Sequence, residues 1–421
     1  MIASALYNII DSVFIGKYVG PEAFQGLTIS FPLMNLTAAF GTLFGLGFAS
    51  LMSIKLGQKD YLSANYILGN LLIINLIVGG SLTVVCLIFL KPILLFFGAS
   101  AHTLPHAYEF MTIIIAGNII THIFFGLNGI IRSLGRPKIA MTATLMTIVL
   151  NILFAFLFVV HFKWGIKGSA AATVLAQVIV LFWQIYLLSN KSQFVYWQAG
   201  ALRLQPKLIL TAMSIGLSPF LINAASSVII ILINHQLLKS GGDDAVGAYG
   251  IINRFTILFV MVIWGINQGM QPIVGYNYGA RKFDRVKSAY GKAVIFATVV
   301  MTLGFLIGEI FPRQIAHIFT NDSAMIEYAI PGLRWVFMLF PFIGFQIVSS
   351  SFFQSIGKAN KAIILSVSRQ VVLLIPFLLI FPHFWGIKGI WAGISLSDGL
   401  SVFLAAALIW MEMKNLKKTS I

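Results

Sequence analysis

The feature that most constrains this chain is a series of long apolar runs, each separated from the next by a short polar or charged break. A bilayer has a hydrocarbon core about 30 Å thick, which needs roughly 20 apolar residues per spanning helix. With 59% hydrophobic and 10% charged residues, the 421-residue chain has too little polar surface to cover a soluble globule. The sequence therefore predicts an all-α membrane protein with about 12 transmembrane helices.

The predicted spans end at polar or turn-forming breaks such as Lys91-Pro92 and Gly241-Gly242. Their approximate ranges are 1–17, 26–54, 66–90, 108–131, 138–161, 169–189, 207–238, 247–275, 289–312, 329–353, 362–382 and 389–411. The first is apolar only from Ile2 to about Gly16, so we expect a truncated first helix. A cleaved signal peptide is the alternative, but no small-residue cleavage site follows the apolar stretch.

The net charge of +16 is explained by topology. If both termini are cytosolic, eighteen Lys and Arg residues fall in the inside breaks and seven in the outside breaks. Basic residues accumulate in cytoplasmic loops of membrane proteins. We therefore expect a protein of the plasma (inner) membrane with both termini in the cytosol, and no binding of nucleic acid.

Three pairs of similar segments indicate an internal repeat. "LGQKDYLSA" parallels "YGARKFDRV", "RSLGRPKIA" parallels "QSIGKANKA", and "KWGIKGSAA" parallels "FWGIKGIWA", at offsets of 221 to 222 residues. Because each half holds an even number of spans, both halves enter the membrane from the same side. The sequence predicts two six-helix bundles, 1–190 and 207–421, related by a parallel pseudo-two-fold repeat and joined by a cytosolic linker over 191–206.

The chain resembles the multidrug and toxic compound extrusion (MATE) transporters. The resemblance covers essentially the whole chain and is carried by "ALYNIIDSVFIGKYVG" in the first span, "GLSPF" in the seventh and "GINQGMQPIVGYNYGARKFDRV" in the eighth. It implies a V-shaped pair of bundles, monomeric in the bilayer. It also implies export of small organic cations and drugs, a form of xenobiotic efflux, in exchange for protons or sodium ions.

Asp11 is a carboxylate in an otherwise apolar run. At bilayer depth it costs roughly 2.5 to 3.5 kcal/mol and is kept only with a partner or a task. The MATE resemblance makes Asp11 the cation-coupling residue of the first bundle, together with Asn151 and Thr173, and puts Ala155 where a second aspartate belongs. The alternatives are structural hydrogen bonds for Asp11 and Asn151, and close helix packing for Thr173.

The second half has buried polar candidates of its own. Arg369 and Asp398 lie at similar depths in adjacent predicted spans, and we expect them to form a charge pair, either as a structural salt bridge or as part of a cation site. Gln268, Gln271 and Asn277 are candidates for lining a substrate cavity, or else they mark the end of the helix before a basic loop.

Other function classes fit the sequence less well. A flippase for a lipid-linked precursor, in the wider MATE-like superfamily, is the alternative, but it should have a more cationic interior than Arg254, Arg334 and Arg369 supply. An intramembrane prenyl-chain transferase would need clustered carboxylates, and the twelve acidic residues contain no Asp-x-x-Asp pair. No phosphate-binding glycine loop occurs. We therefore expect a transporter and not an enzyme, with no metal site and no cofactor beyond the coupling ion, H⁺ in preference to Na⁺.

Overall fold

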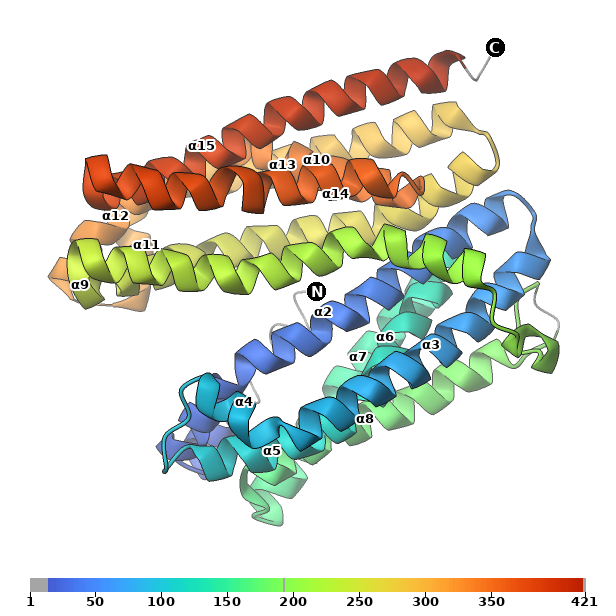
Figure 1. Ribbon diagram of the computed structural model, residues 1–421, viewed down its shortest axis with the longest axis horizontal. Helices are drawn as coiled ribbons and strands as arrows, with labels where there is room; N and C mark the ends of the chain where they lie inside the picture. Colours follow the sequence, from blue (N-terminus) through green and yellow to red (C-terminus); the bar gives the residue numbers. More distant parts are fainter. Residues whose placement is uncertain (1–13, 192–193, 321, 419–421) are drawn as a thin grey trace. The chain divides into compact units, whose positions relative to one another are not determined.

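The structure is a computed structural model that describes residues 14–191, 194–320 and 322–418. Within these ranges all regular structure is helical and no strand occurs. The helices form two compact units, Met1–Phe220 and Leu221–Ile421 (Figure 1). The predicted all-α class is therefore confirmed.

The first unit is a bundle of helices that begin and end at the turn residues of the sequence. Proline is the first residue of both α2 and α7, where its missing N–H costs no hydrogen bond. The bounds are α2 (Pro21–Gly57), α3 (Tyr61–Ile88), α4 (Leu90–Phe96), α5 (Leu104–Ala116), α6 (Asn118–Ser133), α7 (Pro137–Ala155), the π-helical η1 (Phe156–His161), α8 (Gly165–Leu188) and the short 3₁₀ turn η2 (Ala199–Leu202).

The second unit begins within a long helical stretch, α9 (Pro206–Gly279), which is broken at Gly242. It continues through α10 (Phe283–Ile310), α11 (Pro312–Phe319), α12 (Ser323–Phe337), α13 (Phe340–Ser355), α14 (Ala359–Val367), the π-helical η3 (Ser368–Leu374) and α15 (Ile375–Lys418). The last stretch is broken at Gly386. Gly242 and Gly386 have φ of 71° and 55°, values that favour glycine, and the chain reverses direction at each (Figure 1).

The backbone confirms the internal repeat. Residues with positive φ recur at the offsets seen in the sequence: Gly20 with Gly242, Lys59 with Arg281, Gly135 with Gly357, and Gly165 with Gly386. Lys59 and Arg281, at φ of 59° and 58°, take a left-handed conformation that is uncommon for residues other than glycine. The two halves therefore share turn geometry as well as helix order.

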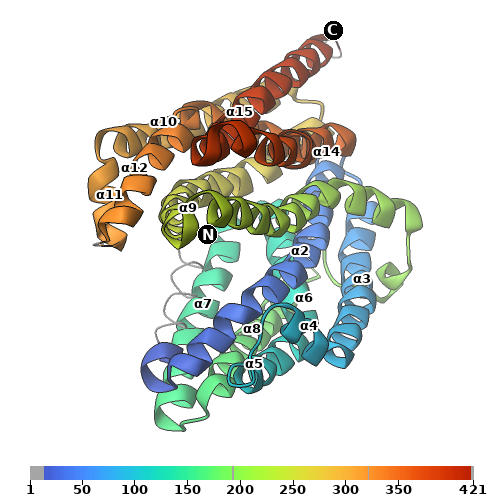
Figure 2. The same ribbon diagram turned by 60° about the vertical axis from the view of Figure 1, so that its left-hand side comes forward.

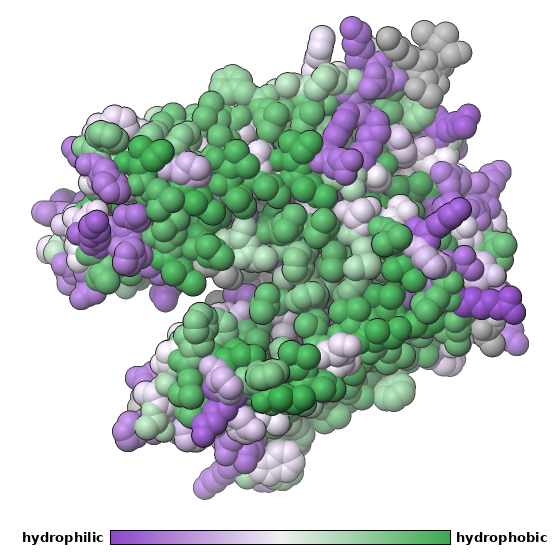
Figure 3. All heavy atoms as spheres, in the orientation of Figure 1, coloured by the Kyte–Doolittle hydropathy of each residue, from purple (hydrophilic) through white to green (hydrophobic). Residues whose placement is uncertain are grey.

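Within the described residues, seven helices are long and apolar enough to cross a membrane, or up to nine if each bent helix pair is one span. Two of the seven contain the breaks at Gly242 and Gly386, so each covers two of the predicted spans. The bent pairs are α5 with α6, at 50°, and α12 with α13, at 55°. On each unit, apolar side chains cover the middle of the visible helices and hydrophilic ones gather near the helix ends (Figure 3). This surface matches a bilayer and not water.

In the first unit, α6 packs against α2, α3, α7 and α8, and this places its middle inside the bundle (Figure 2). The start of α9 packs on α2 so closely that a Cβ at Gly216 would overlap the carbonyl oxygen of Leu43. Close approach of this kind is how membrane helices gain packing energy without a hydrophobic driving force.

Candidate functional site

In the first unit the structure joins two of the predicted cation-coupling residues. The Nδ2 atom of Asn151, on α7, donates a 3.0 Å hydrogen bond to Oγ1 of Thr173, on α8. That hydroxyl in turn donates to the backbone carbonyl of Ser169 at 3.2 Å. Both side chains are buried. The pair therefore links α7 to α8 away from the bundle surface.

Ala155 lies one helical turn after Asn151 and is fully buried. It is the last residue of α7 before the π-helical segment η1. An alanine here gives the site neither charge nor side-chain oxygen. The two described side chains of the pair therefore offer neutral amide and hydroxyl groups only.

The other predicted member of this site, Asp11, lies outside the described residues. Its part in cation coupling stays a prediction from the sequence. Among the residues that the structure describes, no cluster of three or more His, Cys, Asp or Glu side chains could hold a metal ion.

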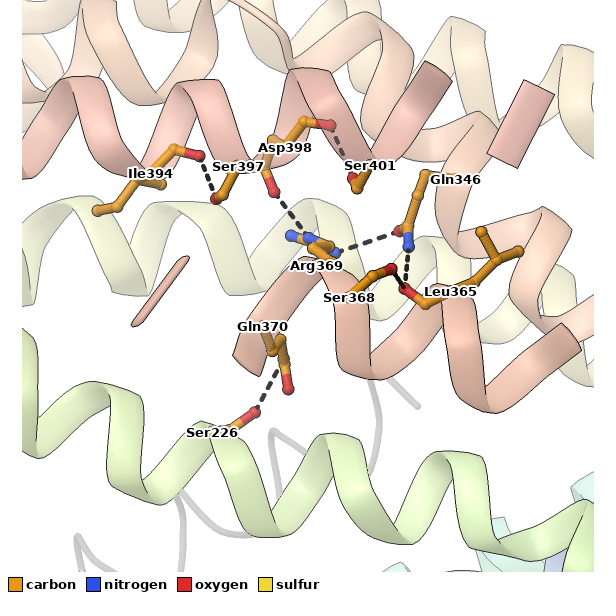
Figure 4. A network of polar contacts seen from close by, with 10 residues as sticks. All are labelled: Ser226, Gln346, Leu365, Ser368, Arg369, Gln370, Ile394, Ser397, Asp398 and Ser401. Atoms are coloured by element: carbon orange, nitrogen blue, oxygen red, sulfur yellow. Dashed lines mark hydrogen bonds and ion pairs between the residues drawn. The ribbon is translucent and has the colours of Figure 1, made fainter. Parts of the chain in front are cut away.

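In the second unit, the predicted charge pair forms. The Nε atom of Arg369, in η3, lies 2.7 Å from Oδ1 of Asp398, on α15 (Figure 4). The Nη1 atom of Arg369 also donates to Oε1 of Gln346, on α13, at 3.4 Å, and the Nε2 atom of Gln346 donates to the carbonyl oxygen of Leu365. The Asp398 side chain is 7% exposed and that of Arg369 27%. Because π-helical turns are rare and concentrate at functional sites, the place of Arg369 in η3 is notable.

The repeat shows that this charge pair belongs to one half alone among the described residues. At the repeat offset, Gln177 occupies the position of Asp398 and Thr147 that of Arg369. Gln177 accepts a 2.5 Å hydrogen bond from the hydroxyl of Thr121, whereas Thr147 bonds within its own helix, to the carbonyl oxygen of Ala143. A neutral contact in one unit thus corresponds to an ionic contact in the other.

The predicted cavity-lining residues on α9 differ in burial, and two of them have different hydrogen-bond partners. Gln271 is buried and its Nε2 atom donates to Oε1 of Gln354, on α13, at 3.3 Å. Asn277 donates to the carbonyl oxygen of Ile273 in its own helix. Gln268 is half-buried. A common substrate surface for these three residues stays a prediction.

Sequence reasoning missed a set of polar residues on α6 and α8, of which His122 and Gln177 are buried and Thr121 is half-buried. Thr121 and His122 are neighbours on α6; Thr121 contacts Gln177, and the Nε2 atom of His122 lies 3.0 Å from the carbonyl oxygen of Thr37. Single polar residues inside apolar spans were the available signal, since such residues face the bundle interior and are commonly functional.

Comparison with known proteins decides the family. The family model described as MatE matches residues 1–157 and 209–380, which is most of the chain. The chain belongs to the MatE family. It is accordingly an integral membrane transporter of small molecules and not an enzyme.

Curated relatives of this MatE protein are named as export proteins. A "Multidrug export protein MepA" of Staphylococcus saprophyticus is 24% identical over 412 residues, 97% of this chain and 90% of that protein. A protein of the same name from Staphylococcus haemolyticus is 23% identical over 408 residues, covering 97% of this chain and 89% of the relative.

Solved structures share the fold over almost the whole chain. A structure described as "MATE in the bent conformation" has a TM-score of 0.93 at 25% identity and covers 99% of this chain and 93% of that one. A "multidrug resistance MATE family transporter" in an outward-facing conformation has a TM-score of 0.91 at 26% identity, with the same two coverages. The predicted family and fold are both confirmed.

Proposed function

We propose that this protein is a multidrug exporter that moves organic cations out of the cytosol by proton-coupled antiport. The observation that carries the proposal is its similarity, over 97% of its length, to proteins named as multidrug export proteins. The proposed mechanism is alternating access, in which a proton and a drug molecule bind preferentially to different conformational states of one transporter.

The ion site of the first unit favours a proton over sodium. A hard cation such as Na⁺ gains from several oxygen ligands and from negative charge, by the same logic that governs calcium sites. Ala155 supplies neither, so Asp11, Asn151 and Thr173 are left with a single carboxylate. One carboxylate that loads and releases a proton is sufficient for proton coupling. We assign these three residues to cation coupling on that basis.

The driving force is adequate. One positive charge moving inward yields about 2.3 kcal/mol per 100 mV, which supports about fifty-fold accumulation of a neutral solute at one-to-one exchange. Exchange of a proton for a monovalent organic cation is electrically neutral, so the chemical proton gradient would drive it.

The proposal includes a topology and a domain organisation. The positive charge in alternate loops supports cytosolic termini in a plasma (inner) membrane. The repeat supports two bundles, residues 1–190 and 207–421, with 191–206 as the linker, and a monomer as the working unit.

The experiment is dye efflux from a bacterial strain that lacks its own drug pumps. Cells that express this protein should accumulate less ethidium than cells with an empty vector, and an uncoupler that removes the proton gradient should abolish the difference. If ethidium accumulates equally in both strains although the protein is present in the membrane, drug export is contradicted and a lipid-precursor flippase becomes the better candidate.

A further inference from the structure

His122 lies in the interior of the first unit, and its ring is only half satisfied. The residue is 1% exposed, on the central helix α6. Its Nε2 atom lies 3.0 Å from the carbonyl oxygen of Thr37, on α2. A carbonyl oxygen only accepts hydrogen bonds, so Nε2 carries the proton of the neutral ring. The Nδ1 atom therefore presents a lone pair, and this atom is buried without a hydrogen-bond partner.

Two glycines make room for the ring. A Cβ at Gly41, on α2, would lie 3.2 Å from the ring atom Cδ2, and one at Gly79, on α3, would lie 3.5 Å from Nδ1. The imidazole thus lies between α2 and α3, at the point where each helix has a glycine. A buried acceptor without a hydrogen-bond donor is costly, so a purely structural role leaves the unpaired lone pair of Nδ1 unexplained.

Further unpaired polar atoms belong to the same part of the bundle. Asn118, one turn before His122 on α6, has an unpartnered Nδ2 atom, and Asn75, one turn before Gly79 on α3, has an unpartnered Oδ1 atom. Buried polar atoms of this kind usually bind water or take part in function.

A line of polar residues, held by two side-chain hydrogen bonds, runs from His122 to the predicted coupling pair. We name this line the polar ladder: Asn151, Thr173, Gln177, Thr121 and His122. Asn151 bonds to Thr173, and Gln177 lies one turn beyond Thr173 on α8. Gln177 bonds to Thr121, the neighbour of His122 on α6. The ladder crosses the bundle from α7 through α8 to α6, and His122 is the titratable member.

No charged or titratable side chain of the described residues contacts the ring, which interacts with the Thr37 carbonyl alone. The charged and titratable side chains on α6 and on the helices packed against it lie toward the helix ends or at positions along the helices other than that of His122. They are Glu22, Lys55, Tyr61, Tyr66, Cys86, His106, Tyr108, Glu109, Arg132, Lys138, Lys167 and Tyr186. Cys86 lies about 10 Å along α3 from Gly79, at seven residues' distance. A charge on His122 would therefore be unpaired in the arrangement seen here.

We infer that His122 is a second proton-binding site of the first unit, which takes a proton on Nδ1. Binding joins a proton to the Nδ1 lone pair and gives an imidazolium ion with N–H donors at both ring nitrogens. No acceptor is hydrogen-bonded to Nδ1 in the arrangement seen here, so the protonated ring favours a rearranged interior that brings an acceptor, a water molecule or an acidic group to Nδ1. By linkage, a site that prefers one conformation drives the protein toward it. The link to export, though not the proton binding itself, rests on the proposed function.

The first experiment measures the proton directly. The protein is labelled with ¹⁵N-histidine, and its ring-nitrogen NMR signals are recorded in lipid bilayers across pH 5 to 8, with and without ethidium. His122→Gln identifies the His122 signal among the seven histidines and retains an amide donor for Thr37. We expect the His122 Nδ1 signal to change from that of an unprotonated to that of a protonated nitrogen within this range. We also expect ethidium to shift the midpoint of this titration. If Nδ1 stays unprotonated from pH 5 to 8, both with and without ethidium, the inference is overturned.

The second experiment tests coupling, with proton release measured in detergent and the pH profile of transport measured in proteoliposomes. Ethidium added to detergent-purified protein should release protons, and His122→Gln should reduce the release by about one proton per protein while ethidium still binds. His106→Gln is the matched control, because His106 lies in the same unit but is partly exposed near Glu22. Unchanged release and an unchanged pH profile of transport in folded His122→Gln would overturn the coupling role. If ethidium is not transported at all, the proposed function fails, and the NMR titration still decides whether His122 binds a proton.

Discussion

Arg369 in η3 and Asp398 on α15 form an ion pair inside the second unit, with 2.7 Å between Nε and Oδ1. Gln346 adds a second contact to this guanidinium group from α13, so three helical segments meet there. Removing one member of a buried pair leaves the other charge in a medium that solvates it poorly. The pair is therefore a test of whether charges in this unit stabilise each other.

We predict that Arg369→Ala and Asp398→Ala each destabilise the protein by about 3 kcal/mol, and that the double variant loses less than the sum of the two by about 1 to 3 kcal/mol. Thermal unfolding in detergent measures this. Arg334 and Glu309 are the control pair, since their side chains are 55% and 44% exposed and should show a coupling below about 1 kcal/mol. A double variant that loses the full sum of the two single losses would refute the pairing.

A second prediction concerns the hydroxyl of Thr173. Thr173→Val keeps the shape of the side chain but leaves Nδ2 of Asn151 without this acceptor, so the stability should fall by about 1 to 3 kcal/mol. Coupled dye efflux should fall more strongly, and Thr173→Ser should restore both. Thr147→Val is the matched control on α7, because the hydroxyl of Thr147 bonds only to the carbonyl of Ala143. Normal efflux in a stably expressed Thr173→Val variant would remove Thr173 from the coupling site.

The third prediction concerns Asp11. Asp11→Asn keeps the size and polarity of the side chain but cannot load and release a proton, so membrane insertion should persist while proton-coupled efflux is lost. Efflux of ethidium at matched membrane levels measures this loss. Glu22→Gln is a control, since the side chain of Glu22 is 59% exposed. Full efflux by Asp11→Asn would show that its carboxylate is not the coupling group.

The fourth prediction is a pH dependence of stability at the turn between α2 and α3. Asp60 caps α3 by accepting from the N–H of Ser63, and it lies 2.9 Å from Nζ of Lys55. Partial burial raises the pKa of Asp60, but the hydrogen bonds and the Lys55 charge outweigh it, so its pKa lies below the usual 3.8. Because the pKa of Asp60 is lower in the folded state, its ionised carboxylate contributes stability above pH 3.8. This stability is lost as the pH falls through the pKa of the folded state.

Asp60→Asn keeps the helix cap and removes the charge, so it isolates this effect. The wild type should be more stable than the variant by at most about 1 kcal/mol from about pH 5 upward, since Asp60 is about one third exposed, and the difference should vanish on further acidification. A difference in unfolding midpoint that grows as the pH falls below 3.8 would contradict the assignment.

The sequence was sufficient for the fold because apolar runs and loop charges follow from the bilayer, and because the repeat offset indicates two halves of the same organisation. It also predicted the contact of Arg369 with Asp398, and the MATE resemblance assigned Asn151 and Thr173, which form a hydrogen bond, to one site. It did not predict the π-helical turns η1 and η3, which depend on local packing that leaves no periodic pattern in the residues. His122 was missed because one histidine in an apolar helix shows its role only when its unpaired Nδ1 atom is seen among neighbouring helices.

The measurement that tests proton coupling most directly is dye transport in proteoliposomes under imposed gradients, with Ala155 as the variable. A pH gradient alone should drive ethidium transport, and a sodium gradient at clamped pH should drive little. Ala155→Asp adds a carboxylate at a fully buried position and should raise the sodium dependence, whereas the neutral control Ala155→Asn should not. If sodium alone drives transport in the wild type at clamped pH, and Ala155→Asp does not increase that dependence, proton coupling at this site is contradicted.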